Sequence, residues 1–168
     1  MIRRLFALPL LFTLAVVLLV VFVVRFYTVA DPSMEPTLRR GDHVVALRWS
    51  WRGLERGDVV ALKLPPRARA LCGVQAGVFL KRIIGASGDR VAERRGRVVL
   101  NGSVLREPYA RRDAQTVPAR RVPRDSYWVL GDNRASSCDS RVWGPLPKRD
   151  VLGRVVATFW PPTRIGVR

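Results

Sequence analysis

VFLKRII, at residues 78–84, is the stretch that best indicates the fold, because it has the composition of a strand. Side chains alternate between the two faces of a strand, so Phe79, Lys81 and Ile83 share one face. Five further short runs, rich in apolar and β-branched residues and bounded by Gly, Pro, Asp or Asn, lie at residues 43–49, 58–64, 97–100, 127–130 and 151–159. This punctuation is typical of strands and turns. The sequence therefore predicts an all-β domain of short strands, arranged as a barrel or as folded sheets.

The segments between these runs predict loops and a single domain. Residues 65–77 and 106–124 are rich in Pro and Arg and lack a clear period, so we expect surface loops there. The 12 Pro and 13 Gly argue against a mostly helical body. A chain of 168 residues has room for one domain and an appendage.

The appendage is the N-terminal segment. Residues 5–24 carry no charge, and a helix of that length would be about 30 Å long, the thickness of a bilayer's hydrocarbon core. Arg3 and Arg4 precede it, which favours a cytoplasmic N-terminus. We expect residues 1–25 to be a cytoplasmic tip and one transmembrane helix, with residues 26–168 as an extracytoplasmic domain joined through a short tether at 25–31. A cleaved signal peptide remains an alternative, although its apolar core would be unusually long.

Charge and cysteine content exclude few classes of protein. The chain has 30 Lys and Arg against 13 Asp and Glu, a net charge of +17. No aromatic-basic repeat, zinc spacing or recognition-helix pattern favours nucleic acid as the partner. The basic surface, with Trp49 and Trp51, could contact anionic lipid headgroups, but solvated charge and a buried tryptophan are equally compatible with it. Cys72 and Cys138 permit one disulfide or two free thiols, and their spacing predicts no metal site. No cofactor is expected.

A candidate nucleophile follows the apolar segment. Ser33 lies in DPSMEPTL, residues 31–38, where the flanking prolines restrict the backbone and could hold a hydroxyl at a fixed angle. A rigid turn without catalytic function is an equally good interpretation of this segment alone. A serine nucleophile needs a base, and the single histidine, His43, is preceded by Asp42, which is too close along the chain to be an obvious orienting partner.

Lysine is the other candidate base. Arginine stays protonated near neutral pH, so only Lys63, Lys81 and Lys148 qualify. An amine that is substantially neutral at pH 7 needs its pKa lowered by about 3 units, or about 4 kcal/mol, for which desolvation is the available source. Lys81 has apolar neighbours on its strand, but Lys63 lies between two leucines, so local sequence does not choose between them.

A third segment, GDNRASSCDSR at residues 131–141, is dense in turn formers and small hydroxyls. Such side chains bond to nearby backbone groups, which predicts a structured loop. A hydroxyl of this loop could orient the lysine amine, and Asp139 and Arg141 could form a supporting ion pair. A self-contained turn is the alternative.

Taken together and in order, these segments resemble the bacterial type I signal peptidase (leader peptidase) family, serine proteases with a Ser-Lys dyad on an all-β domain behind a membrane span. The resemblance covers most of the chain and rests on PSMEPTL at residues 32–38, GD at 41–42, FLKRIIGASGD at 79–89 and GDNRASSCDSRVWGPLP at 131–147. It implies Ser33 as nucleophile and Lys81 as general base. It also implies that Ser137 orients the lysine and that Asp139 and Arg141 support the loop.

The resemblance further implies a substrate and a location. The substrates would be membrane-inserted secretory precursors, cut after small side chains, and the enzyme would be a monomer in the bacterial cell membrane. Some members carry a serine two residues before the nucleophile that helps to bind the oxyanion, where this chain has Asp31. We therefore expect the oxyanion to rely on backbone N–H groups, including that of Ser33. A specialised conjugation or surface-assembly peptidase, and a non-enzymatic tethered protein that binds lipid or nucleic acid, remain alternatives.

Overall fold

The computed structural model describes residues 12–14, 16–17, 20–48 and 53–167. The strands are β1 Val24–Thr28, β2 His43–Leu47, β3 Val59–Lys63, β4 Val78–Gly85, β5 Arg90–Arg94, β6 Arg97–Leu100, β7 Ser103–Val104, β8 Val117–Arg121, β9 Ser126–Leu130, β10 Leu146–Pro147, β11 Val151–Trp160 and β12 Gly166–Val167. The helices are η1 Pro32–Met34, α2 Pro66–Cys72, η2 Arg134–Ser136, α3 Ser140–Trp143, η3 Lys148–Asp150 and η4 Pro162–Arg164.

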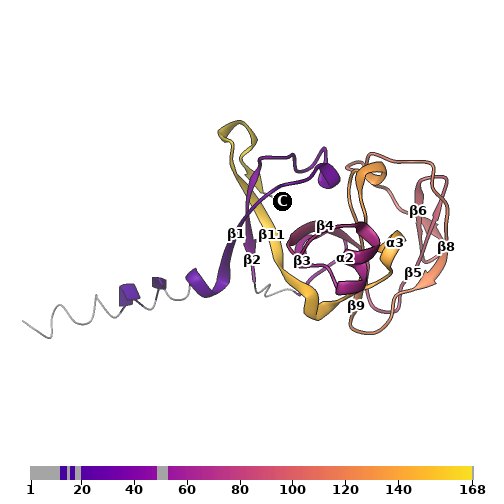
Figure 1. Cartoon of the computed structure of the whole chain (residues 1–168), viewed down its shortest axis with the longest axis horizontal. Coiled ribbons are helices and arrows are strands. Elements are labelled where there is room, and N and C mark those ends of the chain that lie inside the picture. The colour runs from indigo at the N-terminus through magenta and orange to yellow at the C-terminus, as the bar shows by residue number, and fades with distance from the viewer. Residues whose placement is uncertain (1–11, 15, 18–19, 49–52, 168) are drawn as a thin grey trace, which may run out of the picture.

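Two antiparallel sheets make up the body. The larger sheet has eight strands in the order β1-β2-β11-β3-β4-β9-β10, with β12 paired to β11. The smaller sheet has four strands in the order β7-β6-β5-β8 and lies at the right of Figure 1, on the side of the body opposite β1 and β2. The long strand β11 pairs with both β2 and β3, so segments from both ends of the chain meet in one sheet.

The sheets are held by three apolar clusters. One cluster packs Met34 of η1, and Leu38 four residues later, against β2, β3 and β11. A second lies around β3, β4 and β9. The third joins Ile84 and Trp128 of the larger sheet to Val91 and Val98 of the smaller one. Burial of these side chains is what fixes the position of β4 and of the loop after β1.

Every strand run expected from the sequence is a strand in the structure, with ends that differ by up to two residues. Three other expectations were wrong. Residues 65–77 contain α2, and residues 106–124 contain β8. Residues 25–31 are not a tether, because Val24–Thr28 pairs along its whole length with β2. Trp49 and Trp51 lie outside the described residues.

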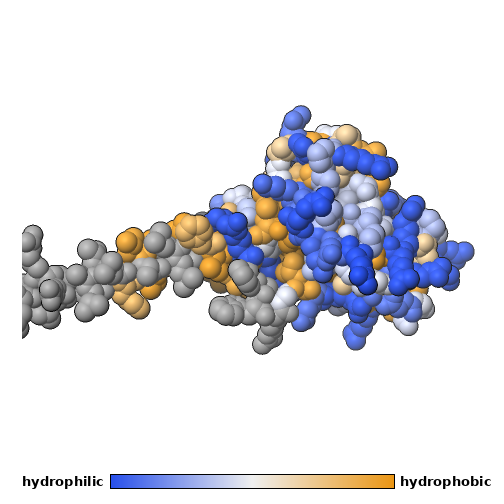
Figure 2. Space-filling model, turned by 90° about the horizontal axis from the view of Figure 1, so that it is seen from below, coloured by the Kyte–Doolittle hydropathy of each residue, from blue (hydrophilic) through white to orange (hydrophobic). Residues whose placement is uncertain are grey.

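Half of the expected membrane span, residues 5–24, also lies outside the described residues. Within the part that is described, no helix is both long and apolar enough to cross a membrane. The described side chains that precede β1 form an apolar extension beside a mostly hydrophilic body, as Figure 2 shows. Its large apolar side chains are exposed, among them Phe12, Val21 and Phe22.

Candidate active site

Ser33 lies in the 3-10 turn η1, directly after β1 and its connecting residues. Its side chain is buried, with the residue only 3% exposed. Pro32 begins the turn, and the Asp31 carboxylate caps it by accepting a hydrogen bond from the Ser33 N–H at 2.8 Å. The Ser33 carbonyl accepts a bond from Asn133 N–H at 2.9 Å, which joins this turn to the third segment. Two segments a hundred residues apart therefore fix the backbone of Ser33.

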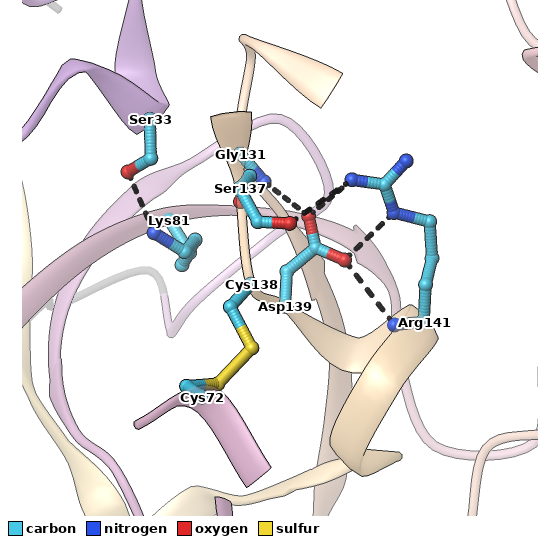
Figure 3. The surroundings of a disulfide bond; sticks show 8 residues. All are labelled: Ser33, Cys72, Lys81, Gly131, Ser137, Cys138, Asp139 and Arg141. Atoms are coloured by element: carbon cyan, nitrogen blue, oxygen red, sulfur yellow. Dashed lines mark hydrogen bonds and ion pairs between the residues drawn. A yellow bond between two sulfur atoms is a disulfide. The ribbon is translucent and has the colours of Figure 1, made fainter. Parts of the chain in front are cut away.

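Lys81 is brought to Ser33 by strand β4. Its Nζ lies 2.7 Å from the Ser33 Oγ, and Figure 3 shows the two groups facing each other. Lys81 is 2% exposed, and Phe79 and Ile83, which share its strand face, pack in one apolar cluster. The desolvation that the sequence argument required is present.

The rival bases lie elsewhere. Lys63 is exposed at the end of β3. His43 lies on β2, 3.3 Å from the Thr28 hydroxyl, and its ring packs against Phe159. Local sequence could not separate Lys63 from Lys81, whereas the fold does so by burying one and exposing the other.

Burial also sets the charge state of the amine. It lowers the pKa of Lys81 below the ordinary lysine value, because the charged form loses its hydration. The carboxylates of Asp31, Asp139 and Asp132 oppose this shift and Arg141 adds to it, but the direction stays downward. A lowered pKa increases the neutral fraction of the amine, which is the form that can accept the serine proton.

The third segment forms a loop organised around a buried carboxylate. Asp139 is fully buried and accepts a hydrogen bond from Gly131 N–H at 3.1 Å. Arg141 donates to both of its oxygens, at 2.8 and 2.9 Å. The expected ion pair between Asp139 and Arg141 is therefore present, and it ties the two ends of the loop together (Figure 3).

Ser137 lies in this loop next to Gly131. A Cβ at position 131 would collide with the Ser137 side chain, so this close approach requires a glycine. The Ser137 hydroxyl is buried and has no hydrogen-bond partner among the described residues. The structure shows no bond between Ser137 and Lys81, and the orienting role of Ser137 stays a prediction.

Cys72 and Cys138 form a disulfide, which resolves the two alternatives left by the sequence. The bond joins the last residue of α2 to the residue between Ser137 and Asp139 (Figure 3). It closes a loop between residues that are 66 positions apart. The helix that the sequence analysis missed is thus bonded covalently to the loop beside Lys81.

Removing this crosslink is expected to destabilise the protein. The double variant Cys72→Ser/Cys138→Ser should lower the free energy of unfolding by about 2–4 kcal/mol, because the unfolded chain regains the entropy of the open loop. Urea titration of both proteins measures the difference. Wild type treated with a reductant should match the variant, and equal stability of the oxidised wild type and the variant would contradict the prediction.

Two charged residues that the sequence analysis did not single out hold the serine turn against β4. Arg82 donates to both oxygens of Asp132, at 2.9 and 2.6 Å. The Thr37 hydroxyl donates to the same carboxylate at 2.5 Å. Both Arg82 and Asp132 lie in motifs already quoted. Because side chains alternate along a strand, the sequence places Arg82 on the face opposite Lys81, and this alternation was the signal that could have identified it.

The sequence analysis also missed a second group of charged residues, which contacts the loop at residues 131–141. Arg134 and Glu107 are both fully buried side chains that form an ion pair at 2.5 Å. Arg134 also donates to the Gly131 carbonyl at 2.9 Å. Glu93 of β5 lies 3.8 Å from both Arg134 and Arg141, and burial raises the pKa of its carboxyl. These charges connect the smaller sheet to the loop beside Lys81.

The serine and lysine side chains open onto a small cavity of about 170 Å³. Its walls include Leu64, Val74 and Phe79, together with the disulfide, and Asp31 also lines it. Among the described residues, no cluster of His, Cys, Asp or Glu side chains is placed to bind a metal ion. A serine hydroxyl bonded to a desolvated amine beside an apolar cavity is the arrangement of a nucleophilic hydrolase.

Comparison with known proteins gives the family. The family model described as "Signal peptidase, peptidase S26" matches residues 2–160. The chain belongs to this family, and it is a peptidase. It is 40% identical over 149 residues to "Probable signal peptidase I-2" of Synechocystis, covering 87% of this chain and 67% of that protein.

Other relatives agree. The chain is 36% identical over 149 residues to "Signal peptidase I" of Leptolyngbya laminosa, covering 86% of this chain and 73% of the relative. It is 30% identical over 161 residues to "Signal peptidase IB" of Staphylococcus aureus, covering 83% and 80%. The crystal structure of a signal peptidase I from Enterococcus faecalis matches with a TM-score of 0.51 and 28% identity, covering 62% of this chain and 98% of that one. The mostly β fold is therefore that of a signal peptidase I.

Proposed function

We propose that this protein is a membrane-bound endopeptidase that removes N-terminal signal peptides from secreted precursors by acyl-enzyme catalysis with a Ser-Lys dyad. The observation that carries the proposal is the distance of 2.7 Å between the Lys81 Nζ and the Ser33 Oγ, both of them buried. Membership of the signal peptidase family supports the choice of substrate.

In the proposed reaction, the neutral Lys81 amine takes the proton of the Ser33 hydroxyl as the oxygen attacks the scissile carbonyl. The amine then gives this proton to the leaving nitrogen, the peptide bond breaks, and an acyl ester remains on Ser33. Lys81 next takes a proton from water as the water oxygen attacks the ester carbonyl. The bond from the carbonyl to the Ser33 Oγ then breaks, and Lys81 returns the proton to that oxygen, which regenerates the serine hydroxyl and the neutral amine. Ser137 would orient the amine during these transfers, because its buried hydroxyl has no hydrogen-bond partner in the described part of the chain and buried polar groups require one.

The cavity beside the dyad supports selection of small side chains. The cavity has a volume of about 170 Å³, which all of the substrate side chains that enter it must share. Leu64, Val74 and Phe79 give it an apolar lining. An extended precursor segment would lie along this site as an added strand and place small side chains in it. Large side chains would be rejected because the disulfide and the strands leave the walls little freedom to move.

Three observations support a location in the bacterial cell membrane with the β domain outside, and Arg3 and Arg4 before the apolar run favour a cytoplasmic N-terminus. The described residues before β1 expose Phe12, Val21 and Phe22, which would be stable in a bilayer. The Cys72–Cys138 disulfide is favoured by an oxidising compartment. The net charge of +17 suits anionic lipid headgroups as a second partner beside secretory preproteins. We propose that the enzyme acts as a monomer with a single membrane span.

The test is cleavage of a labelled secretory precursor by the full chain in detergent. Wild type is expected to release the signal peptide after a small residue, and Ser33→Ala is expected to abolish release. Ser103→Ala is the matched control. Ser103 is exposed on β7, so this variant should cleave the precursor at the wild-type rate. Release of the peptide by Ser33→Ala at the control rate would refute the proposal.

A further inference from the structure

The Asp31 carboxylate occupies a position that the reaction needs. Its Oδ1 accepts the hydrogen bond of the Ser33 N–H at 2.8 Å. In acyl transfer to a serine, the backbone N–H of the nucleophile is a common donor to the negatively charged oxygen of the tetrahedral intermediate. One N–H cannot form a full hydrogen bond to both oxygens at once. The carboxylate and the substrate oxygen therefore compete for the same donor.

The charge of Asp31 also acts on the base. Among the groups around Lys81, Asp31 is the foremost contributor that raises the pKa of the amine, ahead of Asp139 and Asp132, while burial and Arg141 lower it. A carboxylate here keeps more of the amine protonated at a given pH. Its position and its charge thus oppose catalysis in two separate ways.

Asp31 differs from the other aspartates near the site in how it is held. Asp132 and Asp139 are fully buried. Asp132 forms an ion pair with Arg82, and Asp139 forms one with Arg141. Within the described part of the chain, no ion pair holds Asp31, which is only half-buried and lines the cavity. Moving the Asp31 side chain toward solvent therefore costs less than moving either of the other two, which would break a buried ion pair.

We propose that Asp31 closes the oxyanion site of the resting enzyme, and that its carboxylate must leave the Ser33 N–H before the scissile carbonyl can bind there. The contact is autoinhibitory. A substrate bound in the cavity displaces the Asp31 carboxylate from the Ser33 N–H, and without substrate the hydrogen bond stays formed. This inference rests on the proposed function of Ser33 and Lys81. It predicts that removing the carboxylate makes the enzyme faster.

The experiment compares Asp31→Ala and Asp31→Asn with wild type in single-turnover cleavage of the labelled precursor, from acidic to alkaline pH. On the alkaline plateau, where Lys81 is neutral in every protein, Asp31→Ala should be faster by about tenfold, the gain expected if the closed form holds about nine-tenths of the molecules. Asp31→Asn can still cap η1 through its amide oxygen, so its plateau gain should be smaller. Both variants should reach half of the plateau rate at a lower pH, because the pKa of Lys81 falls when the carboxylate charge is lost.

Glu35→Gln is the matched control, since it removes a carboxylate at the same distance along the chain on the other side of Ser33. Glu35 pairs with the exposed Arg111, so this variant should keep the wild-type rate and pH profile. A plateau rate for Asp31→Ala at or below that of wild type would overturn the inference, and so would an unchanged plateau with only the acidic limb moved. Should Asp31→Ala fail to fold, Asp31→Asn provides the test: a plateau rate above that of wild type supports the inference, and a rate at or below it overturns the inference. Ser33→Ala is run in parallel: if it cleaves, the proposed function fails, and if it is inactive while the Asp31 variants gain nothing, only the inference fails.

Discussion

Replacing Lys81 with methionine is expected to lower the rate of precursor cleavage by about four orders of magnitude. The thioether fills a similar volume but cannot accept the proton of Ser33, and loss of one member of such a catalytic unit removes most of its effect. The fold should persist, because a buried amine is exchanged for an apolar group. Thermal unfolding checks the fold, and single-turnover cleavage checks the rate.

Lys63→Met is the control for this prediction, since Lys63 is an exposed lysine on the neighbouring strand and should retain full activity. The pH profile of wild type adds a second check. Only the neutral amine accepts a proton, so the rate should rise with pH and reach half of its maximum below the ordinary lysine pKa of about 10.4. A Lys81→Met enzyme that cleaves within tenfold of wild type would exclude Lys81 as the base.

The second large effect concerns stability rather than chemistry. Glu107→Leu should lower the free energy of unfolding by about 3–5 kcal/mol, because it leaves the buried Arg134 guanidinium without its closest counter-charge. Cleavage should also fall, since Arg134 holds the Gly131 carbonyl of the loop beside Lys81. Urea titration of the purified variant measures the loss of stability.

The double variant Glu107→Leu/Arg134→Met makes this test specific to the ion pair. Replacing both charges with apolar side chains removes the buried unpaired cation, so the double variant should recover much of the lost stability. Glu55→Leu, which changes an exposed glutamate, should remain within about 0.5 kcal/mol of wild type. A double variant less stable than Glu107→Leu alone would show that the pair itself is not the source of the effect.

Strands were predictable where apolar residues alternate between turn formers, as in residues 78–84. Two of the missed strands, β8 and β1, lack that signal. β8 contains Pro118 and two consecutive arginines and is mostly exposed, so nothing in its composition marks it as paired. β1 continues directly from an apolar run, which hides where a membrane segment would end and a strand begin. Helix α2 has Pro66 at its start and Gly73 at its end, two signals that the surrounding arginines and prolines obscured.

The candidate site shows the same division. The positions of Ser33 and Lys81 followed from motifs, but their proximity depends on the pairing of β3 with β4 and on burial of Met34, which no local pattern specifies. The bond between Cys72 and Cys138 could not be chosen over free thiols from two cysteines alone. Buried charges such as Glu107 lie in segments that look solvated, and only their partners across the fold explain them.

The pairing of β1 with β2 has a consequence for how the enzyme stands relative to a bilayer. The last residue of the apolar run, Val24, is already the first residue of the sheet, and Ser33 follows only nine positions later. At about 3.3 Å per residue, nine positions reach no further than about 30 Å. If the apolar run spans the bilayer, the folded sheet fixes the distance between Ser33 and the membrane surface. A precursor would then be cut only where its scissile bond lies at that distance from the membrane.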